Sequence, residues 1–159
     1  MGKLRNNPEK ERDAAWALAE LAKAPWATLC LADGNEPYGV PISHALIENR
    51  LYFHCADAGK KVDMLERNPH ACVSAVSFAE AWPEKMTMRY RSVVATGAVE
   101  LLPEDSAEKA QALYEICRKF AASNPNGKRC AEKPNGHVRL YRMTIEDITG
   151  KESHMDGRE

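Results

Sequence analysis

The first 24 residues carry apolar side chains at the spacing of one helix face. Asn7 and Pro8 are typical of a helix start, because Asn caps free N–H groups and Pro suits the first turn. Pro25 is typical of the position just beyond a helix end. An N-terminal helix is therefore predicted within residues 1–24. Its apolar face consists of Ala14, Ala17, Leu18 and Leu21.

Alternating polar and apolar positions then predict a run of strands. Residues 26–32, 37–47 and 51–55 have this pattern and are separated by two short polar turns. Such spacing is typical of a three-stranded meander. Pro41 lies in the middle segment and has no N–H to donate to a strand ladder. It indicates a bulge, a sheet edge or a place where a ligand meets the backbone.

A short basic helix is predicted after the third of these strands. Asp57 is the expected N-cap and Pro69 the expected stop. The helix start combines free backbone N–H groups, the positive end of the helix dipole and the side chains of Lys60 and Lys61. A phosphate group needs these features. A plain surface crossover has them as well.

The second half of the chain mixes strand, loop and helix patterns. Strands are predicted at residues 70–78 and 137–148, and one bent or two short strands at residues 86–102, with a bulge at Gly97. The remaining segments are predicted loops at 79–85 and 123–136 and a frayed tail at 152–159.

A further amphipathic helix is predicted to start at Pro103-Glu104-Asp105. Its apolar positions are Ala110, Leu113, Tyr114, Cys117, Phe120 and Ala121. Closely spaced strands, mostly joined by hairpins, predict one domain over residues 1–159. The predicted fold class is mainly β (α+β): an antiparallel sheet or barrel with flanking helices.

Composition excludes several classes of protein. The net charge of −1 gives no basic footprint for nucleic acid or lipid, and no apolar run is long enough for a membrane span. The N-terminus lacks the apolar region of a signal peptide. The five cysteines form no C-x-x-C pair. This pattern predicts a cytoplasmic protein without a disulfide scaffold or a structural zinc site.

No phosphate-loop, dinucleotide-fold, nucleophile-elbow or zinc-protease motif is present. Three segments instead offer backbone and polar groups to a flat anionic ligand. They are residues 38–44, residues 53–61 and residues 89–93. Lys61 and Arg91 are the candidate partners of a phosphate charge. Taken singly, His44 and His54 suit ordinary strand histidines as well as catalytic ones.

With these residues in view, the sequence resembles the pyridoxamine 5′-phosphate oxidase-related FMN-binding proteins, in the branch that includes nitroimidazole-resistance proteins. The matching segments are Pro37-Tyr38-Gly39-Val40-Pro41-Ile42-Ser43-His44, residues 51–69 with the Gly59-x-Lys61 turn, Tyr90-Arg91-Ser92-Val93 with Gly97, and residues 145–151. The resemblance implies a split antiparallel Greek-key β-barrel that forms a homodimer, with FMN at the subunit interface and a small-molecule substrate. The basic FMN and substrate motifs of true pyridoxamine-phosphate oxidases are absent here, so that activity is not expected.

The resemblance also assigns site residues. His54 and His44 are the catalytic candidates, and Lys61 is the phosphate ligand. The implied cofactor-binding residues are Val40, Pro41, Ile42, Ser43, Phe53, His54, Cys55, Ala56, Gly59, Lys61, Tyr90, Arg91, Ser92 and Val93. The predicted function is electron transfer from FMN to a small molecule such as a nitro-aromatic. Two alternatives stay open: a flavin or haem carrier or sensor without turnover, and an interaction protein with an empty barrel.

Overall fold

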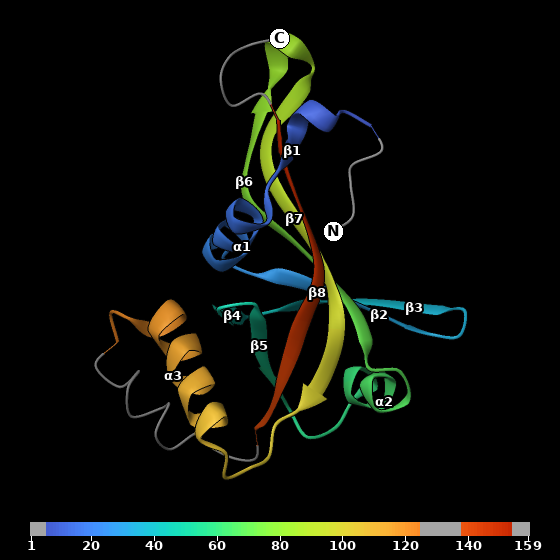
Figure 1. Ribbon diagram of the computed structural model, residues 1–159, viewed down its shortest axis with the longest axis vertical. Helices are drawn as coiled ribbons and strands as arrows, with labels where there is room; N and C mark the ends of the chain where they lie inside the picture. The colour runs from blue at the N-terminus through green and yellow to red at the C-terminus, as the bar shows by residue number, and fades with distance from the viewer. Residues whose placement is uncertain (1–5, 125–137, 154–159) are drawn as a thin grey trace.

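The computed structural model describes residues 6–124 and 138–153. In chain order its elements are η1 (Pro8–Lys10), β1 (Glu11–Arg12), α1 (Ala14–Lys23), β2 (Ala27–Asp33), β3 (Glu36–Ile42), β4 (His44–Ile47), β5 (Arg50–Cys55), α2 (Lys60–Arg67), β6 (His70–Trp82), η2 (Pro83–Lys85), β7 (Thr87–Leu101), α3 (Ala107–Ala121) and β8 (Arg139–Ser153). In the described part of the chain, the strands form one antiparallel sheet in the order β3-β2-β6-β7-β8-β5-β4, with β1 beside β8. The upper halves of β6, β7 and β8 extend as an arm (Figure 1).

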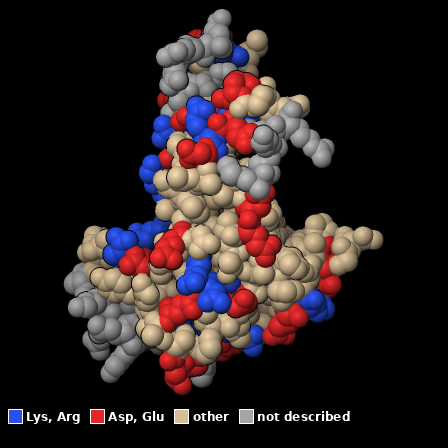
Figure 2. Space-filling view, in the orientation of Figure 1, with Lys and Arg blue, Asp and Glu red and all other residues tan. Residues whose placement is uncertain are grey.

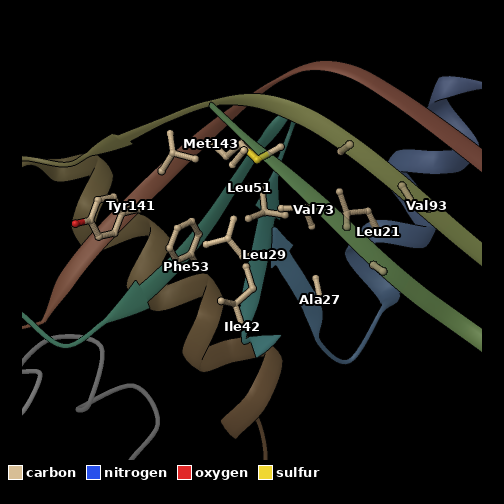
Figure 3. Close-up of a cluster of buried hydrophobic side chains, with 14 of the residues drawn as sticks. Leu21, Ala27, Leu29, Ile42, Leu51, Phe53, Val73, Val93, Tyr141 and Met143 are labelled. Carbon is tan, nitrogen blue, oxygen red and sulfur yellow. The ribbon is translucent and has the colours of Figure 1, made fainter. Parts of the chain in front are cut away.

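The sheet curls around the larger of two apolar clusters because its strands place large side chains on the same face. Leu29, Leu51, Phe53, Val73 and Met143 are fully buried there (Figure 3). Burial of this apolar surface is the main favourable term in folding. Helix α1 packs on β8, α2 on β2, and α3 on β4 and β5. The three helices therefore cover the sheet at different places, as Figure 1 shows.

Several sequence predictions are confirmed. The strands predicted at residues 26–32 and 51–55 correspond to β2 and β5, and the apolar side of α1 is buried or half-buried as expected. Because β3 ends the sheet order, Pro41 lies in an edge strand. The bulge expected at Gly97 is present as well. Gly97 pairs with Ile145 and Thr96 with Asp147, so Glu146 of β8 is the extra residue.

The predicted three-stranded meander is wrong. The segment expected as one strand at residues 37–47 breaks at Ser43 into β3 and β4, which lie at opposite ends of the sheet order. His44 at the start of β4 is fully buried, and it pairs with Phe53 on β5. The chain thus leaves the β2–β3 hairpin at Ser43 and closes the other side of the barrel.

Two predicted helix starts are also wrong. Asn7 has left-handed backbone angles and caps only the short turn η1, because the next residues pair with β8. Asp13 caps α1 instead, and its carboxylate accepts a 2.8 Å hydrogen bond from the Trp16 N–H. The N-cap of α2 is Gly59, whose φ angle is 133°, and not the predicted Asp57. The carboxylate of Asp57 lies 4.0 Å from Arg139.

The loop predicted at residues 79–85 belongs mostly to a hairpin. Strand β6 continues to Trp82, pairs with β7 along its whole length and reverses through η2. The Arg89 guanidinium lies 4.5 Å from the centre of the Trp82 ring, a contact that favours the extended pairing. The expected fraying from residue 152 is wrong for Glu152 and Ser153, which belong to β8.

Helix α3 begins later and is rotated relative to the prediction. It is capped by Ser106, whose hydroxyl accepts a 3.1 Å hydrogen bond from the Lys109 N–H. Its buried residues are Lys109, Ala112, Leu113 and Ile116, whereas Tyr114 and Phe120 are about half exposed. Most of the predicted 123–136 loop, the start of the predicted 137–148 strand, Cys130 and the tail from residue 154 lie outside the described residues.

Candidate functional site

The start of α2 is an uncapped helix N-terminus flanked by two lysines. None of the described side chains caps it, and the Gly59 carbonyl accepts hydrogen bonds from the N–H groups of Val62 and Asp63. Lys60 forms an ion pair with Glu36 and lies over the Tyr38 ring at 5.2 Å. By contrast, Lys61 forms no ion pair or hydrogen bond with any described residue, and its amine lies 5.8 Å from the Phe53 ring centre. Within the described residues, Lys61 is therefore a cation without a counter-charge.

Lys61 affects the groups at the end of β5. The pKa of His54 is lowered by partial loss of water around its ring and then by the Lys61 charge. The pKa of the Cys55 thiol is raised because its burial outweighs the opposing charges of Lys61 and Arg139. The His54 side chain is exposed, so a neutral imidazole lies at the surface beside a positive charge. Such a group is able to accept or donate a proton near neutral pH.

Strand β3 lies beside this helix start. Ile42 is buried in the core with Phe53 (Figure 3). Val40 is half-buried, whereas Pro41 and Ser43 are exposed. Since β3 is an edge strand, its outer backbone groups face no further strand of the described sheet. The structure thus brings the predicted residues of β3 together with Phe53, His54, Cys55, Ala56, Gly59 and Lys61.

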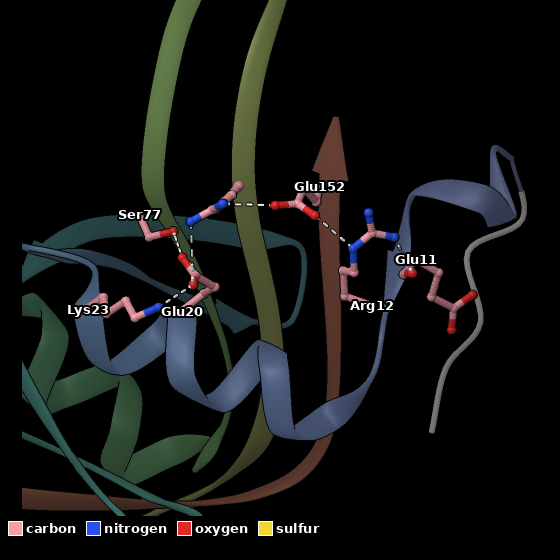
Figure 4. Close-up of polar contacts among 7 residues, drawn as sticks. Glu11, Arg12, Glu20, Lys23, Ser77 and Glu152 are labelled. Atoms are coloured by element: carbon pink, nitrogen blue, oxygen red, sulfur yellow. Dashed lines mark hydrogen bonds and ion pairs between the residues drawn. The ribbon is translucent and has the colours of Figure 1, made fainter. Parts of the chain in front are cut away.

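The predicted residues of β7 lie elsewhere in the subunit. Tyr90, Arg91, Ser92 and Val93 belong to the arm and pair with the last residues of β8, whereas α2 lies at the other end of the molecule (Figure 1). Arg91 is already neutralised. Its guanidinium lies 2.8 Å from the Glu152 carboxylate and 4.0 Å from that of Glu20 (Figure 4). Lys61 and Arg91 do not form one phosphate site within a single chain.

Arg91 belongs to a polar network that fastens α1 to the sheet. Glu20 is 3% exposed and accepts hydrogen bonds from Ser77 at 2.6 Å and Lys23 at 2.7 Å. Its burial raises the carboxyl pKa, but these partners together hold it below its usual value. Arg12 donates to the other oxygen of Glu152 at 2.8 Å. Spacing along the sequence gives no signal for this network, since its members lie up to 140 residues apart.

His44, the second catalytic candidate, is enclosed. It is 0% exposed, and its Nε2 lies 2.8 Å from the Leu21 carbonyl in the last turn of α1 and 3.3 Å from the Lys119 amine. Burial lowers the His44 pKa to about 4, although the hydrogen bond to Leu21 opposes this. A neutral imidazole that donates from Nε2 satisfies one of the free carbonyls at the helix end. A catalytic role for His44 stays a prediction.

Sequence reasoning missed two residues near Lys61. Tyr141 stacks on Phe53 with ring centres 5.5 Å apart, and Arg139 pairs with Cys55 in the register of β5 and β8. Arg139 forms a 3.0 Å ion pair with Glu66. Both residues belong to the predicted last strand, but the β5–β8 pairing that brings them to this site has no signal in the sequence.

The described residues also limit the chemistry. Among them no group of three or more His, Cys, Asp or Glu side chains is arranged to hold a metal ion. No helix in the described part of the chain is long and apolar enough to span a membrane. Positive and negative side chains are interspersed on the face in Figure 2. This face has no extended patch of one sign for a polyanion.

The curled antiparallel sheet with its flanking helices is a split β-barrel, a fold that similar solved structures share. The chain belongs to the pyridoxamine 5′-phosphate oxidase-like family, whose model matches residues 11–152. An uncharacterised protein of Rhizobium meliloti (strain 1021) is 32% identical over 83 residues, which is 52% of this chain. The match spans about half (50%) of that relative's length.

Solved structures share the fold. A candidate 5-nitroimidazole antibiotic resistance protein from Bacteroides thetaiotaomicron has a TM-score of 0.70 and 24% identity, over 88% of this chain and 84% of its own. An FAD-binding protein from Mesorhizobium loti has a TM-score of 0.64 and 25% identity, over 90% and 96%. An FAD- and haem-binding protein from Mycobacterium smegmatis has a TM-score of 0.71 and 20% identity, over 91% and 73%.

Proposed function

We propose that this protein binds FMN between two copies of the chain and transfers electrons to a small oxidised molecule such as a nitro-aromatic compound. The observation that carries the proposal is the unpaired Lys61 at the uncapped start of α2. Two of the similar structures described above are, by their names, flavin-binding proteins. A cytoplasmic location is part of the same proposal.

The helix start fits a phosphate group. A carboxylate N-cap would occupy the anion position, and here the cap is Gly59, which has no side chain. The free N–H groups of the first turn and the Lys61 amine then provide hydrogen bonds and positive charge together. Lys60 contributes less because Glu36 neutralises it.

The flavin ring would lie along the edge of β3 and the end of β5. Backbone groups near Pro41 and Ser43 face outwards, and the Phe53 side chain closes the inner wall. Bound flavin supplies the redox chemistry, and the protein supplies binding and orientation. His54 is exposed and has a lowered pKa, so its neutral ring is suited to pass a proton to or from a small substrate.

A second copy of the chain would complete the site. Val93 and Ala95 point into the core, so Ser92 and Val94 lie on the outer face of β7. Val94 and its neighbour Val76 on β6 are 42% and 47% exposed. The flanking positions Thr28, Cys30, Ser74 and Ser92 on β2, β6 and β7 are uncharged, and Lys151 and Asp147 of β8 lie beside them, opposite Ser92 and Thr96. A face with exposed valines and charged residues at one side suits an isologous contact, which would bring Tyr90 and Ser92 of one subunit to the other.

A carrier or sensor without turnover is the second candidate, because one similar structure binds both FAD and haem by name. Absorbance of the purified protein separates these possibilities. Flavin bands support the proposal, and a Soret band supports haem. Anaerobic addition of NADH or NADPH followed by a nitroimidazole separates enzyme from carrier, since only an enzyme bleaches and recovers the flavin bands repeatedly.

Replacing Lys61 by Ala is expected to weaken FMN binding by about 1.5–3 kcal/mol, the free energy of one charged hydrogen bond. The dissociation constant should therefore rise about 10- to 150-fold, measured by quenching of flavin fluorescence. Lys60→Ala is the matched control, because its amine is already paired with Glu36. An equal loss in both variants would show that the phosphate is not bound by Lys61.

Replacing Val94 by Lys is expected to dissociate the proposed dimer, because it would place a charged side chain from each subunit in the proposed contact. Light scattering during gel filtration measures the mass. Phe120→Lys, at a similarly exposed apolar position on α3, should leave the mass unchanged. A wild-type chain that runs as a monomer at micromolar concentration would contradict the dimer.

A further inference from the structure

Two cysteines face each other on the outer surface of the sheet. Cys30 on β2 and Cys72 on β6 are direct partners in the antiparallel register. Their neighbours Leu29, Leu31 and Val73 are buried in the core, so both thiols point to the opposite face. The Cys30 thiol donates a 3.8 Å hydrogen bond to the Thr28 carbonyl, and both cysteines are half-buried and outside any disulfide.

A groove of about 530 Å³ gives access to this pair. It is lined by Cys30, Leu31, Ala32, Asn68, His70, Ala71, Cys72, Thr96, Gly97 and Glu146. No lysine or arginine lines it, and Glu146 adds an exposed carboxylate at the bulge of β8. The lining therefore favours a cation over an anion.

The geometry of facing strands favours a bridged pair over a disulfide. Side chains directly opposite in antiparallel strands have Cβ atoms about 4.5–5.5 Å apart. A disulfide needs a shorter Cβ separation, about 3.5–4.5 Å. A metal ion with two bonds of about 2.3 Å to sulfur spans about 4.6 Å between the sulfur atoms. Two cysteines directly opposite each other in antiparallel strands can therefore both bind such an ion without movement of the strands.

We propose that Cys30 and Cys72 form a two-coordinate site for a soft monovalent cation, of which Cu(I) is the biological example. Thiolates select Cu(I) among available metals. Zinc needs four ligands, and no third Cys, His, Asp or Glu among the described residues is arranged to join the pair. On binding, two S–H bonds break, two Cu–S bonds form and two protons leave to solvent. No electron is transferred.

A thiol loses its proton when it binds a metal ion as a thiolate, so Cu(I) binding to this pair should be coupled to proton release. The pair lies on the same outer face of the sheet as the proposed dimer contact. Cys72 pairs with Thr96, which is two residues from Val94 along β7.

The test is an anaerobic titration of the full-length protein with Cu(I) in competition with bicinchoninate, a coloured Cu(I) chelator. We expect one Cu(I) per chain, bound at least 100-fold more tightly than by Cys30→Ser or Cys72→Ser. The matched controls Cys55→Ser and Cys117→Ser, which change other half-buried cysteines, should bind Cu(I) as the wild type does. No competition by the wild-type protein, or unchanged binding by both pair variants, would overturn the site.

A second measurement needs no variant. Bound Cu(I) should protect Cys30 and Cys72 from alkylation by iodoacetamide, and leave Cys55 and Cys117 unprotected, as read by peptide mass spectrometry. About two protons should be released per ion in an unbuffered titration. Protection of a different cysteine, or release of no protons, would assign the metal to another place. Both readouts are independent of flavin binding, because Lys61 is not part of the groove.

Discussion

Replacement of Gly97 by Ala is expected to destabilise the fold by at least about 3 kcal/mol. A Cβ atom at this position would lie 1.9 Å from the Thr144 carbonyl oxygen and 2.9 Å from the carbonyl carbon. Those atoms are backbone and have no rotamer to change. The β7–β8 pairing around the Glu146 bulge must therefore shift. This pairing and the β6–β7 pairing are the two most extensive strand contacts of the sheet.

Gly39→Ala is the matched control for this substitution. Gly39 also lies in a strand, but its added Cβ would meet only Thr28 Cγ2 at an ordinary 3.6 Å. We expect a change within about 0.5 kcal/mol. Urea unfolding followed by circular dichroism measures both variants. Similar midpoints for the two would mean that the sheet at Gly97 is looser than the structure shows.

The stability of the wild-type protein is expected to fall by about 3 kcal/mol between pH 6.5 and pH 4 because of His44 alone. Burial lowers its pKa from 6.5 to about 4. Between these values the unfolded chain binds a proton that the folded chain does not, so acid favours unfolding. The contribution is complete above pH 6.5 and is lost progressively as the pH falls towards 4. The neighbouring Lys119 has a pKa of about 8 and keeps its charge throughout this window.

His44→Gln should remove this part of the pH dependence, while it lowers stability at neutral pH through lost packing. An exposed histidine provides the control: His70→Gln should leave the acid-dependent loss intact. Unfolding free energies at several pH values measure the difference. Parallel curves for wild type and His44→Gln would show that the imidazole is not enclosed as the structure has it.

Local patterns predict most of the elements of the fold. Alternating apolar positions identify β2 and β5, and the lack of a donor in Pro41 agrees with an edge strand. The order of the strands in the sheet is not predicted by these patterns. Hairpin spacing favours pairing of neighbouring strands, but burial of His44 and Ile42 on opposite sides of Ser43 separates β3 from β4. Which strands pair depends on how the whole core packs, and no local pattern in the sequence indicates it.

The candidate site likewise combines local features, which the sequence predicts, with tertiary contacts, which it does not. Gly59 and Lys61 are recognisable from the sequence, because a turn followed by a basic helix start is a local feature. The difference between the paired Lys60 and the unpaired Lys61 depends on where Glu36 lies. The sequence suggests Arg91 as a phosphate ligand, but the carboxylates of Glu20 and Glu152, from distant segments, neutralise it. Pairing of charges is set by tertiary contacts, which spacing does not reveal.

The central claim is that the start of α2 binds the phosphate of a flavin nucleotide. The most direct measurement compares the affinities of FMN and riboflavin, which differ only in that phosphate, for the wild-type protein and Lys61→Ala. We expect the wild type to prefer FMN by at least 10-fold, and the variant to lose most of this preference while its affinity for riboflavin changes little. Equal affinities for the two flavins in the wild type, or a preference that Lys61→Ala leaves intact, would contradict the claim.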